Sequence, residues 1–83
     1  MFYTYILKST AHTKIYIGQT SNLERRIWAH ENGLSPWSKK WGPWVLVHSE
    51  EFVTRSEAMA REKFLKTGTG RDWIKNNITN AEM

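Results

Sequence analysis

The stretch YIGQTSNLERRIWAH, residues 16–30, predicts a strand that leads into an amphipathic helix. Its first residues, the YIG of 16–18, are two strand-favouring types followed by a glycine. Ser21 and Glu24 then match a capping box, in which a hydroxyl and an acid three residues later satisfy free amides at a helix start. This start, with the apolar spacing after it, predicts a helix over about residues 22–32.

A β-hairpin is predicted upstream of this helix. Residues 3–8 (YTYILK) alternate and are rich in strand formers, 9–14 (STAHTK) form a polar turn, and 15–18 return as the second strand. Gly18 is expected to let the chain turn sharply toward the helix, because glycine adopts conformations that other residues avoid.

The remaining elements are expected downstream of Asn32 and Gly33, which suit the end of a helix. An irregular loop, SPWSKKWGP over 35–43, is followed by a third strand over 44–52. A helix over 55–66 then begins with the capping box of Thr54 and Glu57. After a break over 67–70, a last helix over 71–77 is expected to dock through Trp73 and Ile74. The order β-β-α-β-α-α predicts one α/β (α+β) domain over residues 1–83, with a three-stranded, largely antiparallel sheet flanked by helices.

Composition narrows the classes of function. The 83 residues contain no cysteine, which excludes disulfides, thiolate zinc sites and cysteine nucleophiles, and favours a cytoplasmic protein. No apolar run suits a signal peptide or a membrane span, so no membrane partner is expected. The net charge of +4 favours a polyanionic partner, although basic proteins can also carry such a charge for solubility alone.

The predicted first helix carries two basic side chains beside its apolar stripe. At 100° per residue, Leu23 and Ile27 define the stripe, and Arg26 and His30 fall together on one flank. Since they are four residues apart, their side chains are stacked neighbours. A solvated helix flank would show the same pattern.

The predicted second helix carries an acid within its apolar arc. The arc comprises Ala58, Met59 and Leu65, whereas Phe64 points elsewhere. Glu62 falls inside it, and a carboxylate there is costly to bury without a partner or a metal. The alternatives are an ion pair with Arg26 or another base, or an arc that is simply exposed.

In combination, these residues resemble the GIY-YIG nuclease superfamily, particularly its small stand-alone members related to the N-terminal domain of the UvrC excinuclease. The pattern Y-I-G-x-T-x-N-L-x-x-R-x-x-x-H is matched by residues 16–30, and the resemblance extends over about residues 3–66. Tyr3-Thr4-Tyr5 stands where the superfamily has G-I-Y, with Tyr3 in place of glycine.

The resemblance implies a set of catalytic residues: Tyr5, Tyr16, Arg26, His30 and Glu62. Glu62 aligns with the glutamate that holds a divalent metal, Mg²⁺ or Mn²⁺. Arg26 would bind phosphate oxygens and His30 would accept or relay a proton. Tyr5 or Tyr16 would orient or deprotonate water, with the resemblance favouring Tyr5, if Arg26, Lys14 or the metal lowers the pKa of the phenol.

A basic and aromatic loop, residues 37–44, is a candidate surface for nucleic acid. Lysines there suit phosphates and tryptophan suits base stacking, although Trp41 and Trp44 could instead cover the edge of the core. The residues expected to contact nucleic acid are Lys14, Gly18, Arg25, Lys39, Lys40 and Trp41.

The resemblance therefore implies a metal-dependent endonuclease that hydrolyses phosphodiester bonds in DNA, in repair or recombination, as a monomer or weak dimer. RNA is the other polymer that such a site could accept. A catalytically inactive nucleic-acid-binding module and a protein-interaction domain are the alternatives.

Overall fold

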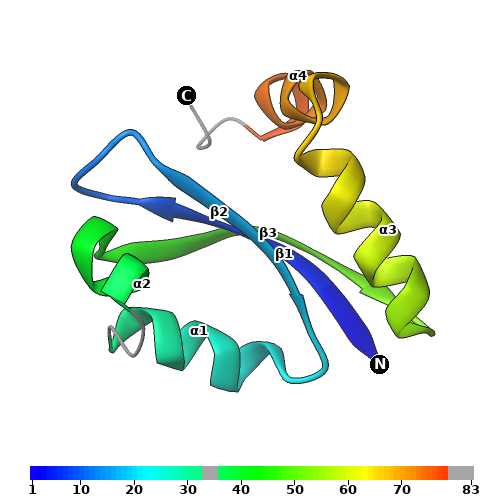
Figure 1. Cartoon of the computed structure of the whole chain (residues 1–83), viewed down its shortest axis with the longest axis horizontal. Coiled ribbons are helices and arrows are strands. Elements are labelled where there is room, and N and C mark those ends of the chain that lie inside the picture. The colour runs from blue at the N-terminus through cyan, green and yellow to red at the C-terminus, as the bar shows by residue number, and fades with distance from the viewer. Residues whose placement is uncertain (33–35, 79–83) are drawn as a thin grey trace.

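The structure is a computed structural model that describes residues 1–32 and 36–78. Its elements are β1 (Phe2–Ser9), β2 (Ile15–Thr20), α1 (Leu23–Glu31), α2 (Pro36–Trp41), β3 (Trp44–Phe52), α3 (Arg55–Leu65) and α4 (Gly68–Asn77) (Figure 1). None of the helices within this described part of the chain has the length and apolar character that a membrane span requires.

The three strands form one antiparallel sheet in the order β2-β1-β3. Tyr5, in the middle of β1, lies opposite Gly18 on β2 and Ser49 on β3. Both β2 and β3 are therefore edge strands. The predicted fold class, a three-stranded antiparallel sheet with helices, is confirmed.

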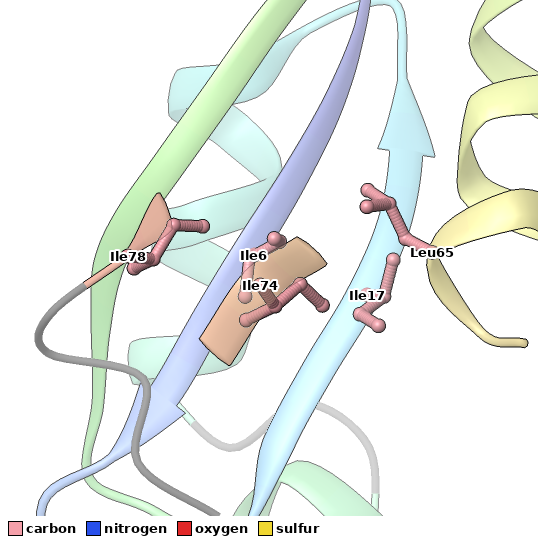
Figure 2. Close-up of a cluster of buried hydrophobic side chains, with 5 residues drawn as sticks. All are labelled: Ile6, Ile17, Leu65, Ile74 and Ile78. Atoms are coloured by element: carbon pink, nitrogen blue, oxygen red, sulfur yellow. The ribbon is translucent and has the colours of Figure 1, made fainter. Parts of the chain in front are cut away.

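The sheet is covered on both faces because successive side chains of a strand point in opposite directions. Tyr5 and Leu7 form one buried cluster with Trp44, packed against α1 and α2. Ile6 points the other way, into a second cluster with β2, α3 and α4, whose members are Ile6, Ile17, Leu65, Ile74 and Ile78 (Figure 2). In Figure 1, α1 and α2 accordingly lie on one side of the sheet and α3 and α4 on the other.

Several predicted boundaries were wrong. Residues 36–41, expected within an irregular loop, form α2; Pro36 stands at its first position, where a missing amide does no harm. The N-cap of α1 is Asn22 rather than Ser21, and its side chain accepts a hydrogen bond from the Arg25 amide. The last helix begins at Gly68, three residues early, because Thr67 caps it. Asn32 closes α1 as expected, while Gly33 lies outside the described residues.

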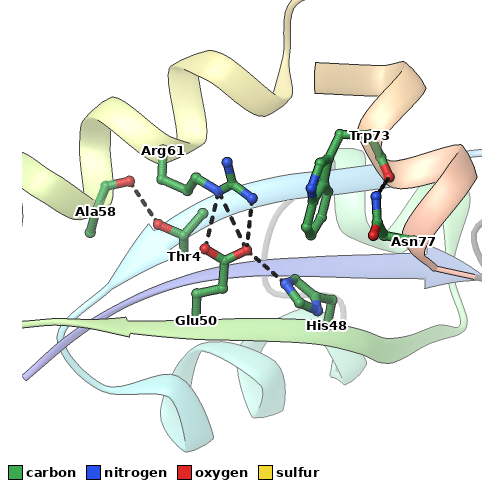
Figure 3. A network of polar contacts seen from close by, with 7 residues as sticks. All are labelled: Thr4, His48, Glu50, Ala58, Arg61, Trp73 and Asn77. Carbon is green, nitrogen blue, oxygen red and sulfur yellow. Dashed lines mark hydrogen bonds and ion pairs between the residues drawn. The ribbon is translucent and has the colours of Figure 1, made fainter. Parts of the chain in front are cut away.

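The position of α3 is set by its start and by two attachments to the sheet. The capping box of Thr54 and Glu57 is formed in full, as predicted. The buried hydroxyl of Thr4 donates to the Ala58 carbonyl at 2.7 Å, which fixes the height of the helix over β1. Arg61 forms two-pronged hydrogen bonds with Glu50 on β3, at 3.0 Å from Nε and 3.2 Å from Nη2 (Figure 3).

The Glu50 carboxylate also fastens α4. It pairs with His48 at 2.7 Å, and His48 packs edge-on against Trp73 of α4. The Arg61 guanidinium lies 4.5 Å from the centre of the Trp73 ring. Burial alone would raise the pKa of Glu50, but hydrogen bonds from His48 and Arg61 outweigh it and hold the pKa below its usual value. The network holds both helices to the same strand.

Glycine at position 70 is required by the close approach of α4 to α3. A Cβ there would overlap the Phe64 carbonyl and lie 2.5 Å from the Leu65 Cα, whereas a Cβ at Gly68 would meet nothing within 4 Å.

We therefore expect Gly70→Ala to lower the free energy of unfolding by about 1–3 kcal/mol, the usual cost of overpacking a close contact. The matched control Gly68→Ala, in the same helical turn, should leave it unchanged or raise it slightly, since alanine favours helix. Urea unfolding of both variants measures the difference; equal stabilities would contradict the packing described.

Candidate active site

The hydroxyl of Tyr5 joins the hairpin to α1. Tyr5 is fully buried, and its Oη accepts a hydrogen bond from Arg26 Nε at 3.3 Å. The same Oη lies 3.3 Å from His30 Nε2. Since the oxygen accepts from Arg26, its own hydrogen can be donated to a neutral His30. Arg26 and His30, which the helical wheel placed together on one flank of α1, thus both contact the hydroxyl of Tyr5.

Tyr16 completes the group from β2. Its ring stacks on that of Tyr5, with 6.0 Å between centroids and 27° between planes, and lies 4.5 Å from the His30 ring. The buried Trp44 contacts both Tyr16 and His30 at 6.4–6.5 Å. The structure therefore brings together four of the five predicted catalytic residues: Tyr5, Tyr16, Arg26 and His30.

Gly18 makes room for this arrangement. A Cβ at this position would lie 2.7 Å from the Tyr5 Oη and 2.8 Å from Tyr16 Cε1. Gly18 is paired within β2, not in a turn before the helix, so the predicted reason for the glycine was wrong. Gly18 is also buried, which does not favour its predicted contact with nucleic acid.

The pKa values in this group keep both Tyr5 and His30 neutral near pH 7. Burial raises the pKa of Tyr5 to about 12, and the hydrogen bond from Arg26 offsets this only in part. Of the cations considered for this role, Arg26 does lower the pKa of Tyr5, but burial outweighs its effect. Burial, followed by the charge of Arg26, lowers the pKa of His30. The hydrogen bonds with Tyr5 and Tyr16 raise the pKa of Arg26, which stays charged.

Glu62 lies on α3, which packs on the other face of the sheet. Its carboxylate accepts a hydrogen bond from Lys66 Nζ at 2.7 Å, so the ion pair that the sequence left open is with Lys66 rather than Arg26. The wheel placed the apolar arc imperfectly: Met59 is 52% exposed, and Phe64 packs against the core. Glu62 itself is half-buried, with 25% of its side chain exposed.

A cleft between α3 and the end of β2 holds Glu62. It has a volume of about 520 Å³ and is lined by Gln19, Ser56, Met59, Ala60, Glu62, Lys63 and Lys66. Because side chains alternate along a strand, Tyr16 and Gly18 of the edge strand β2 face α1, while Ile17 and Gln19 face α3. The phenol group and the cleft therefore flank the same strand.

The cleft has a donor set that fits a hydrated divalent cation. It offers one carboxylate, from Glu62, with the hydroxyl of Ser56 in the same lining, whereas the Gln19 oxygen already accepts a hydrogen bond from Arg55 at 3.0 Å. Magnesium retains several waters and is bound through one or two carboxylates. Lys66, with 54% of its side chain exposed, can swing away from Glu62. No group of three or more His, Cys, Asp or Glu side chains suited to a metal is found among residues 1–32 and 36–78.

Three of the residues predicted to contact nucleic acid form one cluster. Lys14, Lys40 and Trp41 lie together, with both ammonium groups about 5 Å from the indole centre. Arg25 and Lys39 are exposed. Two further contacts were not predicted: His12 packs edge-on against Trp41 at 5.2 Å, and Trp44 contacts the rings of Tyr16 and His30. No spacing in the sequence signals either contact, since both join distant segments.

The free energy of unfolding of Tyr5→Phe should fall less steeply at alkaline pH than that of wild type. Folding keeps Tyr5 protonated up to about pH 12, whereas an unfolded tyrosine ionises near pH 10, so its contribution is complete below about pH 10 and is lost as the pH rises toward 12. We expect the difference in unfolding free energy between wild type and Tyr5→Phe to shrink by about 2 kcal/mol from pH 9 to 11.5. Urea unfolding at each pH measures it. A constant difference would show that Tyr5 ionises as freely in the folded protein as in the unfolded chain.

Comparison with known proteins relates this geometry to one family. Residues 1–77 match the model of the GIY-YIG catalytic domain. A UPF0213 protein of Clostridium perfringens is 43% identical over 67 residues, which cover 80% of this chain and 71% of that protein. A UPF0213 protein of Staphylococcus haemolyticus is 39% identical over 74 residues, covering 88% and 89% respectively.

A solved structure has the same fold. The solution NMR structure of a UPF0213 protein from Bacillus halodurans superimposes with a TM-score of 0.54 at 29% sequence identity. The match covers 92% of this chain and 84% of that protein.

Proposed function

Because the chain belongs to the GIY-YIG catalytic-domain family, a family of nucleases, we propose that it is an endonuclease that hydrolyses phosphodiester bonds in DNA with Mg²⁺ or Mn²⁺. The observation that carries the proposal is the meeting of Arg26 and His30 on the hydroxyl of Tyr5, beside Tyr16. A domain that only bound nucleic acid would need an arginine there, but not a neutral histidine joined to two phenols.

Arg26 is the group that would bind the scissile phosphate. The residue is exposed although its Nε is held by Tyr5, so its planar fork is oriented before a substrate arrives. Its raised pKa keeps the charge at every working pH. A guanidinium fixed in this way stabilises the charge that develops on the phosphate oxygens during hydrolysis.

The two phenols would divide the remaining work. Tyr5 is fully buried, with a pKa of about 12, so it positions Arg26 and His30 instead of meeting water. Tyr16 is half-buried and is therefore the more accessible of the two phenols. Orientation of the attacking water is assigned to Tyr16, although the sequence resemblance favoured Tyr5.

His30 would take up the proton released in the reaction. It is neutral near pH 7, because its pKa is lowered by burial and by Arg26. Its ring lies 4.5 Å from the ring of Tyr16 and its Nε2 faces the Tyr5 hydroxyl. A neutral imidazole beside the phenols can accept a proton or pass it along them.

Glu62 would hold the divalent cation in the cleft beside β2, with the Gln19 side chain in the same lining. When bound, such a cation supplies positive charge to the phosphate and makes coordinated water more acidic. The scissile phosphate would therefore lie at the edge of β2, where Arg26 could approach it from one face of the sheet and the cation held by Glu62 from the other. Repair or recombination of DNA is the proposed setting, with the domain acting as a monomer or weak dimer.

Cleavage assays on end-labelled DNA test this function. Branched, nicked, single-stranded and duplex substrates are incubated with Mg²⁺, Mn²⁺ or EDTA. We expect metal-dependent products from wild type, and a loss of at least about 100-fold in rate for Arg26→Ala and for Glu62→Ala, the usual effect of removing a group that stabilises developing charge. Glu51→Ala, which removes an exposed carboxylate from the opposite edge strand, should cleave at the wild-type rate.

The outcomes separate the proposed function from its alternatives. Circular dichroism first establishes that each variant is folded. Wild-type rates for Arg26→Ala or Glu62→Ala would contradict the roles assigned to these residues. Salt-sensitive binding without a metal-dependent product on any substrate would identify a binding module, and the absence of both would favour a protein-interaction domain.

A further inference from the structure

Two exposed lysines lie over the ring of one half-buried tryptophan. Trp41, the last residue of α2, lies beneath Lys14 Nζ at 4.8 Å and Lys40 Nζ at 5.0 Å from its ring centre. His12 packs edge-on against the same ring at 5.2 Å. These four residues, from the β1–β2 turn and from α2, are called the Trp41 cluster. His12, Lys14 and Lys40 are exposed, and Trp41 is half-buried.

The Trp41 cluster adjoins the active site. Trp41 packs against the buried cluster of Tyr5, Leu7 and Trp44, which Tyr16 also contacts. It therefore lies on the same face of the sheet as Arg26 and the phenols. A nucleic-acid strand held by Arg26 could continue onto this tryptophan.

The cations of the Trp41 cluster differ from those that stack elsewhere in the fold. Arg61 lies over Trp73 but is bound to Glu50, and Arg55 lies over Phe2 while donating to Gln19 at 3.0 Å. Lys14 and Lys40, by contrast, are exposed ammonium groups resting on an indole. An exposed contact between lysine and an aromatic ring is weak, so phosphates can draw the lysines away and uncover the ring.

We propose that the Trp41 cluster binds an unpaired nucleotide of the strand held at the active site. The base stacks on the Trp41 ring, and Lys14 and Lys40 move from the ring to the phosphates on either side of that nucleotide. Stacking on an aromatic side chain needs an open base face, which an intact duplex does not offer. The proposal rests on the proposed function for the identity of its polymer, and it narrows the substrate to DNA with unpaired bases.

Fluorescence anisotropy in EDTA measures binding without cleavage. The probes are labelled oligothymidylate, a strand of equal length that carries abasic sites in place of the bases, and a blunt duplex. We expect wild type to bind oligothymidylate about tenfold more tightly than the abasic strand, the usual effect of one stacked base. Trp41→Ala should bind the two strands equally, and Trp41→Phe should keep part of the preference.

Charge variants test the phosphate contacts without disturbing the core. Lys14→Gln and Lys40→Gln should weaken binding to both single strands alike, and each should reduce the slope of log affinity against log salt by about 0.7, the value for one phosphate on a single strand. Lys75→Gln, an exposed lysine of α4 on the other face of the sheet, is the matched control and should change neither quantity.

Three results would overturn the proposal: equal affinity of wild type for thymidylate and abasic strands, a retained base preference in folded Trp41→Ala, or tighter binding to the duplex than to the single strand. If Trp41→Ala fails to fold, Trp41→Phe and the lysine variants still decide the question. Because no metal is present, a failure here is distinct from a failure of cleavage. If wild type cleaves DNA but binds thymidylate and abasic strands equally, the proposed function stands and this inference is wrong.

Discussion

The hydrogen bonds of the Tyr5 hydroxyl with Arg26 and His30 are the contact on which the rest of the site depends. They join the central strand to α1, and they exist only because Gly18, opposite Tyr5 on β2, leaves room for the phenol. Burial raises the pKa of Tyr5, burial and the charge of Arg26 lower the pKa of His30, and hydrogen bonds with Tyr5 and Tyr16 raise the pKa of Arg26. The space left by Gly18 is therefore a condition for the arrangement that the proposed phosphodiester hydrolysis would use.

The two faces of the sheet contribute different parts of the proposed chemistry. The α1 face carries the arginine, histidine and phenols, whereas the α3 face carries Glu62 in its cleft. The edge strand β2 is the shared boundary, because its alternating side chains point to both faces. Arg61, the residue before Glu62, is hydrogen-bonded to Glu50 of β3. This contact sets the orientation of α3 about its axis, so a network away from the α1 face determines where the Glu62 carboxylate lies. This division is why the residues proposed to bind metal and phosphate come from opposite layers.

Local pattern predicted what depends on local geometry. The four-residue spacing of Arg26 and His30 was enough to place them together, since helix geometry alone makes them neighbours. The environment of Glu62 could not be predicted in this way, because a helical wheel describes a single helix. It gives no information on the neighbouring strand β2 or on the ion pair with Lys66. The pKa of Tyr5 could not be predicted for a related reason: sequence shows which cations can lower it, but not how deeply the phenol is buried. The short α2 was missed because Pro36 signals a break or a helix start equally well.

The most direct test of this dependence is the side-chain NMR signal of Arg26 Nε–H in wild type and in Gly18→Ala. In wild type it should be protected from solvent exchange by its bond to Tyr5. In Gly18→Ala the added methyl group displaces the phenol, so the signal should move to the position and fast exchange of an exposed arginine. The Nε–H of Arg61, bound to Glu50 on the other face of the sheet, should stay unchanged and serves as the internal control. An Arg26 signal with the same shift and protection in both proteins would contradict the claim that the space left by Gly18 assembles the site.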